Sequence, residues 1–380
     1  RGQCRLRGRG REDRGIAPVK LLLICDGAQT GFGRVGRELS HRFVAAGVDL
    51  RWLAINYRGR EGELLAFMRR QASPEAVGRF LAAFDADPIH AFMHPAGSSG
   101  DGMGHNLTMP ALTGGLWPDW VPDRCLIVAD PRAMGYRLRN MEHLFAATPT
   151  WNYVPIEGAS LPPIWRMIWR HVAPVAMSEF GRLELQHLLD RPIPSIPHGI
   201  SESFWPVSSE RPITLADGRT ITSRAEAKDV FTLGGTFTFL RTDRLVPRKN
   251  YAAFFRIMGP ILDNHSDRRL MIHCAPLDEG GDMAEFMSHL PGTFEVHGRW
   301  RHPQIRFTGD HDTFRGYDDP LLATLYNAAD IYVSPTMSEG FGLTLAEAAA
   351  CAVPVVTTAF GAGPESVGPG AVLIPPVAFM

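Results

Sequence analysis

The most informative stretch of this 380-residue chain is Ser334-Pro335-Thr336-Met337-Ser338-Glu339-Gly340-Phe341-Gly342-Leu343-Thr344-Leu345-Ala346-Glu347, which joins a short apolar run to an alanine-rich segment. Gly340 and Gly342 let the backbone turn and approach a ligand closely. A helix that begins near Leu343 would present free N–H groups and a positive dipole end to an anion. Glu339 and Glu347 can accept hydrogen bonds from hydroxyl groups. The stretch therefore predicts a strand, a ligand-binding turn and a helix, although a plain turn with two ordinary carboxylates would have a similar sequence.

On both sides of the 334–347 stretch, short apolar runs alternate with amphipathic stretches along the chain. This alternation is typical of parallel α/β sheets. We expect strands at 237–240, 270–274, 305–308, 331–334 and 353–357, and in the first half at 21–25, 50–55, 89–94, 125–129, 150–156, 172–178 and 195–197. Residues 197–206, rich in Gly and Pro, interrupt the alternation. The pattern predicts an α/β fold with two doubly wound, Rossmann-like domains that face each other across a cleft. We place them at 18–205 and 206–380, after a disordered or incomplete start at 1–17.

Three cations follow the first expected strand of the second half, within Arg244-Leu245-Val246-Pro247-Arg248-Lys249-Asn250. A diphosphate leaving group needs fixed positive charge where its negative charge develops, and arginine and lysine supply that charge without a metal ion. An isolated basic run is more often a solvated loop. Position favours a site here, because this loop and the Glu339 turn both follow strands of one predicted sheet.

Together these motifs resemble the retaining glycosyltransferases of family 4, the glycosyl transferases group 1, which have the two-domain GT-B fold. The resemblance rests on Arg-Leu-Val-Pro-x-Lys-Asn, on Glu-Gly-Phe-Gly-Leu-Thr-Leu-Ala-Glu and on the Val-Pro-Val-Val strand that follows. It implies a UDP- or GDP-sugar donor and no required metal or other cofactor. By this resemblance Arg244 and Lys249 hold the donor diphosphate, Glu339 meets the transferred sugar and Glu347 meets the ribose. The other donor-binding positions that it implies are Phe341, Gly342, Leu343 and Thr344.

The first expected strand leads into Asp26-Gly27-Ala28-Gln29-Thr30-Gly31-Phe32-Gly33-Arg34-Val35-Gly36, which contains the GxGxxG pattern of dinucleotide-binding proteins. In those proteins the pattern opens directly after the strand, and an acidic residue follows about 20 residues later. Neither condition holds here, but Arg58 could meet the extra phosphate of NADP, so an NADP-dependent oxidoreductase stays open. In the resembling family such a loop faces the donor, which suggests Gly31 and Gly33 as donor-binding residues and leaves Gly36 to helix–strand packing.

The acceptor side is less well defined. Residues 153–158 and 178–181 resemble the acceptor-side loops of the family, but many relatives have a histidine in the first of these loops and this chain does not. Glu157 is therefore a candidate acceptor-side residue, with an ordinary loop carboxylate as the equal alternative. His198, beside Gly199 at the expected hinge, is more often a packing or turn residue than a catalytic one.

Two weaker patterns point to a metal and to a membrane. Asp85-Ala86-Asp87 and Asp310-His311-Asp312 have the DxD form that binds metal in another glycosyltransferase fold, but we expect no metal because the cations already offer a clamp. Trp165 and Trp169, each followed by an arginine, could form a membrane-surface stripe. Packing against the sheet is the favoured interpretation.

Composition excludes several classes of protein. Lys and Arg number 39 and Asp and Glu 40, so charge gives no reason to expect a nucleic-acid partner. The five cysteines are scattered, which disfavours disulfides and a zinc site and fits a cytoplasmic location. We expect no transmembrane segment, because no apolar run approaches the roughly 20 residues of a span; peripheral membrane contact stays open.

These observations predict a glycosyltransferase that moves a sugar to an unidentified glycan, lipid-linked or small-molecule acceptor. By resemblance we expect retention through front-face substitution, in which the leaving phosphate assists deprotonation of the acceptor. The alternative from another class is a nucleotide-sugar-binding protein without transferase activity. Relatives usually continue into helices that return to the first domain, so we also expect the chain to be incomplete at its C-terminal end.

Overall fold

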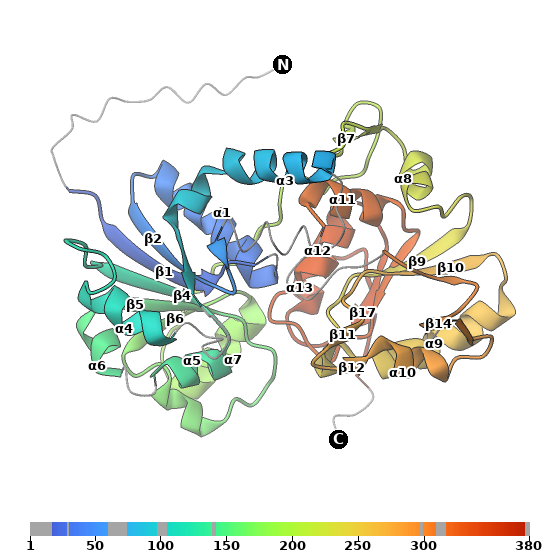
Figure 1. Ribbon diagram of the computed structural model, residues 1–380. Helices are drawn as coiled ribbons and strands as arrows, with labels where there is room; N and C mark the ends of the chain where they lie inside the picture. Colours follow the sequence, from blue (N-terminus) through green and yellow to red (C-terminus); the bar gives the residue numbers. More distant parts are fainter. Residues whose placement is uncertain are drawn as a thin grey trace, which may run out of the picture.

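The computed structural model describes residues 17–28, 30–59, 74–96, 105–138, 142–296, 299–308 and 317–376. Two parallel sheets lie side by side, one in each half of the chain, and helices cover both (Figure 1). Helix α1 (Gly31–Ala45) of the first half and α12 (Leu343–Ala350) of the second lie near the middle of the molecule, where the halves meet (Figure 1).

The first sheet has six strands in the order β3-β2-β1-β4-β5-β6, all parallel. Its strands are β1 (Lys20–Asp26), β2 (Asp49–Ile55), β3 (Met93–Ala96), β4 (Arg124–Val128), β5 (Thr150–Val154) and β6 (Val172–Ala176). The carboxyl ends of parallel strands share one edge, so the loops after β1, β4 and β5 leave the sheet as neighbours.

The second sheet repeats this arrangement, with the order β15-β10-β9-β16-β17-β18 and parallel pairing throughout. Its strands are β9 (Phe237–Arg241), β10 (Arg268–Ile272), β15 (Ile305–Phe307), β16 (Ile331–Ser334), β17 (Val355–Thr358) and β18 (Val372–Ile374). Numbered within its own half, each sheet has the order 3-2-1-4-5-6 of a Rossmann domain. The prediction of two doubly wound α/β domains is therefore confirmed.

Helices and small hairpins complete both domains. The remaining α-helices are α3 (Pro74–Ala86), α4 (His105–Thr113), α5 (Pro131–Leu138), α6 (Glu142–Ala147), α7 (Glu179–Leu189), α8 (Arg224–Val230), α9 (Tyr251–Asn264), α10 (Met283–Ser288), α11 (Asp319–Asn327) and α13 (Gly363–Val367). The 3-10 helices are η1 (Pro88–Phe92), η2 (Pro163–Met167) and η3 (Pro247–Lys249). The hairpins pair β7 (Ile213–Thr214) with β8 (Thr220–Ile221), β11 (Leu277–Asp278) with β12 (Gly281–Asp282), and β13 (Phe294–Val296) with β14 (Arg299–Arg301).

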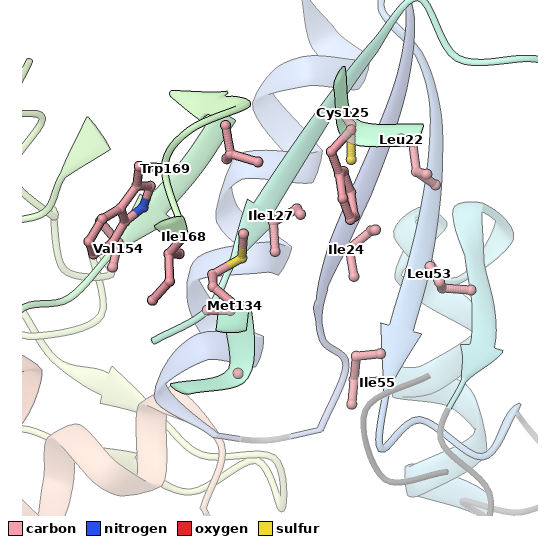
Figure 2. Packing of buried hydrophobic residues seen from close by; sticks show 14 of the residues in the cluster. Leu22, Ile24, Leu53, Ile55, Cys125, Ile127, Met134, Val154, Ile168 and Trp169 are labelled. Atoms are coloured by element: carbon pink, nitrogen blue, oxygen red, sulfur yellow. The ribbon is translucent and has the colours of Figure 1, made fainter. Parts of the chain in front are cut away.

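The central strand β1 is buried on both faces, which explains its unbroken apolar sequence. Leu22 and Ile24 point to one layer, where they join Ile127 and Met134 (Figure 2). The alternate residues of the strand pack in the opposite layer, with helix α1. Because successive side chains of a strand face opposite sides, a sheet covered by helices on both sides needs apolar residues at every position.

Two expected strands were wrong and one strand was missed. Residues 195–197 form no strand and contribute one isolated bridge, between Ser195 and Ala176. The run at 89–94 is mostly η1, which Asp87 caps through a hydrogen bond from the Ile89 amide, and the strand begins at Met93. The sixth strand of the second sheet, β18, was not expected, because its three residues are too few to show a periodic pattern.

Trp165 and Trp169 pack inside the first domain, which confirms the packing interpretation over a membrane-surface stripe. Trp169 is buried and donates a hydrogen bond to the Asn152 side chain, and Trp165 packs against the same core. Four cysteines, Cys25, Cys125, Cys274 and Cys351, are buried free thiols. Among the residues that the structure describes, no helix has the length and apolar character needed to cross a membrane.

Candidate active site

The Glu339 turn is built into the contact between the domains. Gly342 has a φ of 96° and caps α12, a conformation that favours glycine. A Cβ on Gly340 would lie 2.4 Å from the Pro155 Cβ of the first domain, so a side chain there would push the domains apart. Phe341 and Leu343 pack against a hydrophobic core of the first domain. The turn therefore touches the loop after β5 directly.

Lys249 meets Glu339 because their loops follow adjacent strands. Strands β9 and β16 pair in parallel, so both loops leave the same edge of the sheet. Lys249 ends η3, and Asn250, with a φ of 54°, caps the following helix α9. The Lys249 Nζ lies 2.6 Å from Glu339 Oε1 and 2.6 Å from Asp243 Oδ1. All three side chains are buried, so this ion pair is protected from solvent.

Asp243 is the anchor of this group. Its Oδ2 accepts a hydrogen bond of 2.5 Å from the Ser334 hydroxyl, and its Oδ1 accepts a weaker one of 3.3 Å from Thr344. Burial alone would raise the pKa of Asp243, but the Lys249 and Arg241 cations outweigh burial and hold the pKa below its ordinary value. A charged Asp243 fixes the position of the Lys249 ammonium.

Arg244 binds acids of its own domain. Its Nε and Nη2 lie 2.9 and 2.8 Å from the Asp278 carboxylate, and Glu279 is 3.6 Å away. The side chain is 47% exposed. The charge of Arg244 also acts on Asp26 of the first domain. Burial raises the pKa of Asp26, and Arg244 is among the groups that oppose that rise. Its contact with a donor diphosphate stays a prediction.

Glu347 bridges both domains. Arg34 of α1 donates a hydrogen bond to its Oε1, with 2.5 Å between the atoms, and Tyr326 donates to its Oε2 over 2.8 Å. The second amino group of Arg34 lies 2.9 Å from Asp319. Burial raises the pKa of Glu347, and Arg34 opposes this effect. The carboxylate that resemblance assigns to a ribose is thus held by a cation of the opposite domain.

The loop after β1 lies beside the helix of the donor motif. A Cβ on Gly31 would come within 3.5 Å of Leu343, and Gly33 packs against the Ala28 carbonyl. Thr30 caps α1 by accepting a hydrogen bond from the Gly33 amide. Gly36 lies against Trp52 and Cys25, where a Cβ would come within 2.8 and 2.9 Å of them, so its packing role is confirmed.

Glu157 lies at the junction, paired with Arg248. The Arg248 Nη2 is 2.7 Å from Glu157 Oε1, and its Nη1 is 2.9 Å from Glu339 Oε2. His198 contacts the aromatic ring of Phe341 edge-on, with 5.1 Å between ring centres, and lies 3.0 Å from the Tyr153 hydroxyl. Burial lowers the pKa of His198 to about 4, which keeps the ring neutral at pH 7. This geometry is that of a packing residue.

Sequence reasoning missed three residues of this cluster: Asp243, Arg34 and the bridging role of Arg248. Arg248 belongs to the basic motif and Asp243 directly precedes it, so that motif could have drawn attention to them. Arg34 carries no comparable signal, because its partner Glu347 lies 313 residues further along the chain. Only the fold brings that pair together.

The metal patterns have no support from the described residues. Asp310-His311-Asp312 lies outside them. Asp87 of the first triplet pairs with Arg37 over 3.4 Å. In the part of the chain that the structure describes, no group of three or more His, Cys, Asp or Glu residues could hold a metal ion. Metal independence itself remains a prediction.

The comparison with known families and folds defines the class. The family described as glycosyl transferases group 1 matches residues 236–379, so this part of the chain is similar to a glycosyl transferases group 1 domain. The glycosyltransferase from Rickettsia africae ESF-5 has 13% identity and a TM-score of 0.60, over 96% of this chain and 86% of that one. The two Rossmann-like domains thus form a GT-B glycosyltransferase fold.

Two further solved structures share this fold. HepE from Anabaena, in complex with UDP and glucose, has 14% identity and a TM-score of 0.60, over 95% of this chain and 86% of that one. Sucrose-phosphate synthase from Thermosynechococcus elongatus has 17% identity and a TM-score of 0.54, over 95% and 86% of the two chains. At these identities the likeness establishes the fold alone.

A curated relative is similar over a short stretch. The D-inositol 3-phosphate glycosyltransferase of Mycobacterium tuberculosis (strain ATCC 25618 / H37Rv) is 51% identical over 49 residues, 13% of this chain and 10% of that protein. The similarity therefore spans one tenth of the relative's length, and the acceptor named for that protein does not carry over to this chain.

Proposed function

We propose that this protein transfers a sugar from a nucleoside-diphosphate sugar to an acceptor hydroxyl, with retention of the anomeric configuration. The observation that carries the proposal is the buried contact between Lys249 and Glu339 at the edge of the second domain, next to the first. A cation for the diphosphate and a carboxylate for sugar hydroxyls thus lie side by side in a glycosyl transferases group 1 domain.

Each residue then has a role in the reaction. Lys249 and Arg244 stabilise the negative charge that develops on the diphosphate as its bond to the anomeric carbon breaks. Glu339 orients the sugar through its hydroxyls, and Glu347 accepts hydrogen bonds from the ribose. The acceptor oxygen bonds to the anomeric carbon on the face that the diphosphate leaves, and its proton passes to a diphosphate oxygen.

The donor turn and the first-domain loop would enclose the nucleotide sugar. Backbone groups of Phe341, Gly342, Leu343 and Thr344 line the donor on one side, and those of Gly31 and Gly33 on the other. HepE was solved with UDP-glucose, which supports a UDP-linked donor here, with a GDP-linked donor as the second choice. No metal is needed in this scheme, because side-chain cations balance the diphosphate.

The acceptor is a glycan, a lipid-linked molecule or a small molecule that approaches from the first domain near Glu157. We infer a boundary between the domains near residue 205, since Phe204 and Val207 already pack in a core of the second domain. A cytoplasmic location fits the buried free cysteines.

The proposal is tested in two steps. A thermal-shift screen of UDP-glucose, GDP-mannose and ADP-glucose identifies a donor, because a ligand of the native state raises the melting temperature. Release of the nucleoside diphosphate is then measured with water or a panel of sugars as acceptor. Turnover of one donor supports a transferase. Binding without turnover in any acceptor panel favours a nucleotide-sugar-binding protein, and binding of NADP alone favours an oxidoreductase.

A further inference from the structure

Arg248 connects the Glu339 turn of the second domain with Glu157 of the first domain. Its Nη1 contacts both the Ser338 carbonyl and Glu339 Oε2 over 2.9 Å, and its Nη2 lies 2.7 Å from Glu157 Oε1. The side chain is 29% exposed. Its position is the variable one in the Arg-Leu-Val-Pro-x-Lys-Asn pattern, so the family resemblance assigns no role to it.

The two acids that Arg248 joins face each other across the junction. Glu157 belongs to the loop after β5, and Glu339 precedes Gly340, which touches Pro155 in that loop. Burial raises the pKa of Glu157, Arg248 opposes the rise, and the charge of Glu339 adds to it. Two carboxylates in a partly dry junction repel each other unless a cation lies between them. Arg248 therefore offsets the repulsion between the two acids at this point of the junction.

The same guanidinium also sets the orientation of Glu339. Lys249 holds Oε1 of this carboxylate and Arg248 holds Oε2, so the plane of the carboxylate is fixed by one contact on each oxygen. A planar guanidinium holds two carboxylates through separate amino groups in fixed directions, whereas an ammonium is a single point charge on a flexible stem and does not set these directions.

We propose that Arg248 is a positioning residue of the transfer reaction: by bridging Glu157 and Glu339 it lets the domains close and holds Glu339 toward the transferred sugar. This inference rests on the proposed function for the role of Glu339. The other half of the inference, that Arg248 lets the domains close by neutralising two acids, does not rest on the proposed function.

The decisive experiment compares Arg248→Ala, Glu157→Gln and the double variant in the full chain. The readouts are hydrolysis of the donor that the wild type turns over, chosen from UDP-glucose, GDP-mannose and ADP-glucose, and the radius of gyration from small-angle X-ray scattering. We expect R248A to lower kcat about 30-fold with less than about a threefold change in the KM for the donor, because a positioning residue acts on the transition state. We also expect a larger radius of gyration.

Removing the repulsion should then rescue the variant. In the R248A background, E157Q replaces the facing carboxylate by a neutral amide, and we expect kcat to recover about tenfold and the radius of gyration to return. Arg248→Lys should recover less than the double variant, since its single ammonium replaces two amino groups that contact the two acids separately. Arg256→Ala, an exposed position on α9, is the matched control. If R248A loses its circular dichroism signal, Arg248→Gln, which is uncharged but keeps a polar side chain, replaces it in the series.

The outcomes separate the two proposals. An unchanged kcat in R248A, or a double variant no better than R248A alone, overturns the positioning role. If the wild type turns over none of the donors, the proposed function fails, and the scattering series decides the closure claim alone: equal radii in wild type and R248A overturn it.

Discussion

Arg34 of the first domain donates a hydrogen bond of 2.5 Å to Glu347 of the second. The Glu347 side chain is 1% exposed, and Tyr326 occupies its other oxygen. Figure 1 shows the two helices that carry this pair, α1 and α12, near the middle of the molecule. The carboxylate proposed to bind the donor ribose thus accepts hydrogen bonds from an arginine of the opposite domain and from a tyrosine.

Replacing Arg34 by Ala should tighten the binding of nucleoside diphosphate. A ribose hydroxyl that donates a hydrogen bond to Glu347 must compete with Arg34 for the carboxylate, and removing the competitor should gain about tenfold in affinity, or roughly 1.4 kcal/mol. Isothermal titration of UDP and GDP at pH 8 measures the effect. Arg37→Ala, one turn along α1 with its partner Asp87 in the same domain, is the control. Weaker binding by R34A would make Arg34 a ligand contact instead of a competitor.

Replacing Lys249 by Ala should lower turnover by about 100-fold, as expected for the loss of a fixed cation at developing charge. It should also destabilise the fold by about 3 kcal/mol, because Asp243 and Glu339 would each lose the nearer of their two cations and keep only Arg241 and Arg248, respectively. Steady-state kinetics on protein that is still folded by circular dichroism measures the first effect, and urea unfolding the second. Near-normal turnover would contradict the clamp.

A methyl group at Gly340 should separate the domains. Its Cβ would lie 2.4 Å from Pro155, so Gly340→Ala must displace the Glu339 turn from the first domain. A shift of about 1 Å in a reacting group can cost about 100-fold in rate, and we expect a loss of that order in kcat. Gly235→Ala, where a Cβ meets nothing within 4 Å, is the control. Equal rates in the two variants would show that the domain contact is not needed for turnover.

The free energy of unfolding should decrease as the pH is lowered, through the titration of His198. Burial lowers the pKa of this residue from 6.5 to about 4, so the unfolded chain binds a proton in this interval and the native state does not. The contribution is fully present above pH 6.5 and is lost as pH falls toward 4, amounting to up to about 3 kcal/mol. Urea unfolding from pH 7 to 4.5 should show a flatter dependence in His198→Gln than in wild type. The exposed His143→Gln should follow the wild type; if H198Q does so as well, His198 titrates normally.

Donor turnover should be insensitive to chelation, since side-chain cations balance the diphosphate in the proposed scheme. Assays with an excess of EDTA over the protein should give the untreated rate. Loss of activity that Mg²⁺ or Mn²⁺ restores would instead implicate a metal-binding group, with the residues 310–312 as the place to look.

The sequence was sufficient for the fold because each strand carries its own signal. An unbroken apolar run such as Leu21–Cys25 indicates a strand buried on both faces, and the glycine turn before Leu343 marks a helix start. The juxtaposition of Lys249 and Glu339 also follows from local information, since both loops come after strands of one parallel sheet. Short elements such as β18 give no such signal.

Contacts between the domains could not be read from the sequence. Arg34 and Glu347 are far apart in the chain, and nothing local indicates that one will neutralise the other. Arg248 and Arg244 belong to the same basic motif, yet one bridges the domains and the other binds Asp278. Which cation meets which acid depends on how the two sheets are oriented, a property of the tertiary structure.

The central claim is that Glu347 and Lys249 belong to one nucleotide-sugar site. Its most direct test is isothermal titration of UDP, GDP and ADP into wild type, Glu347→Gln and Lys249→Met, at protein concentrations of about 50 μM. We predict that one nucleotide binds the wild type with a Kd of about 100 μM or lower, and that each variant weakens it by about tenfold or more. Binding of none of the three nucleotides, or equal affinity for wild type and both variants, would contradict the account.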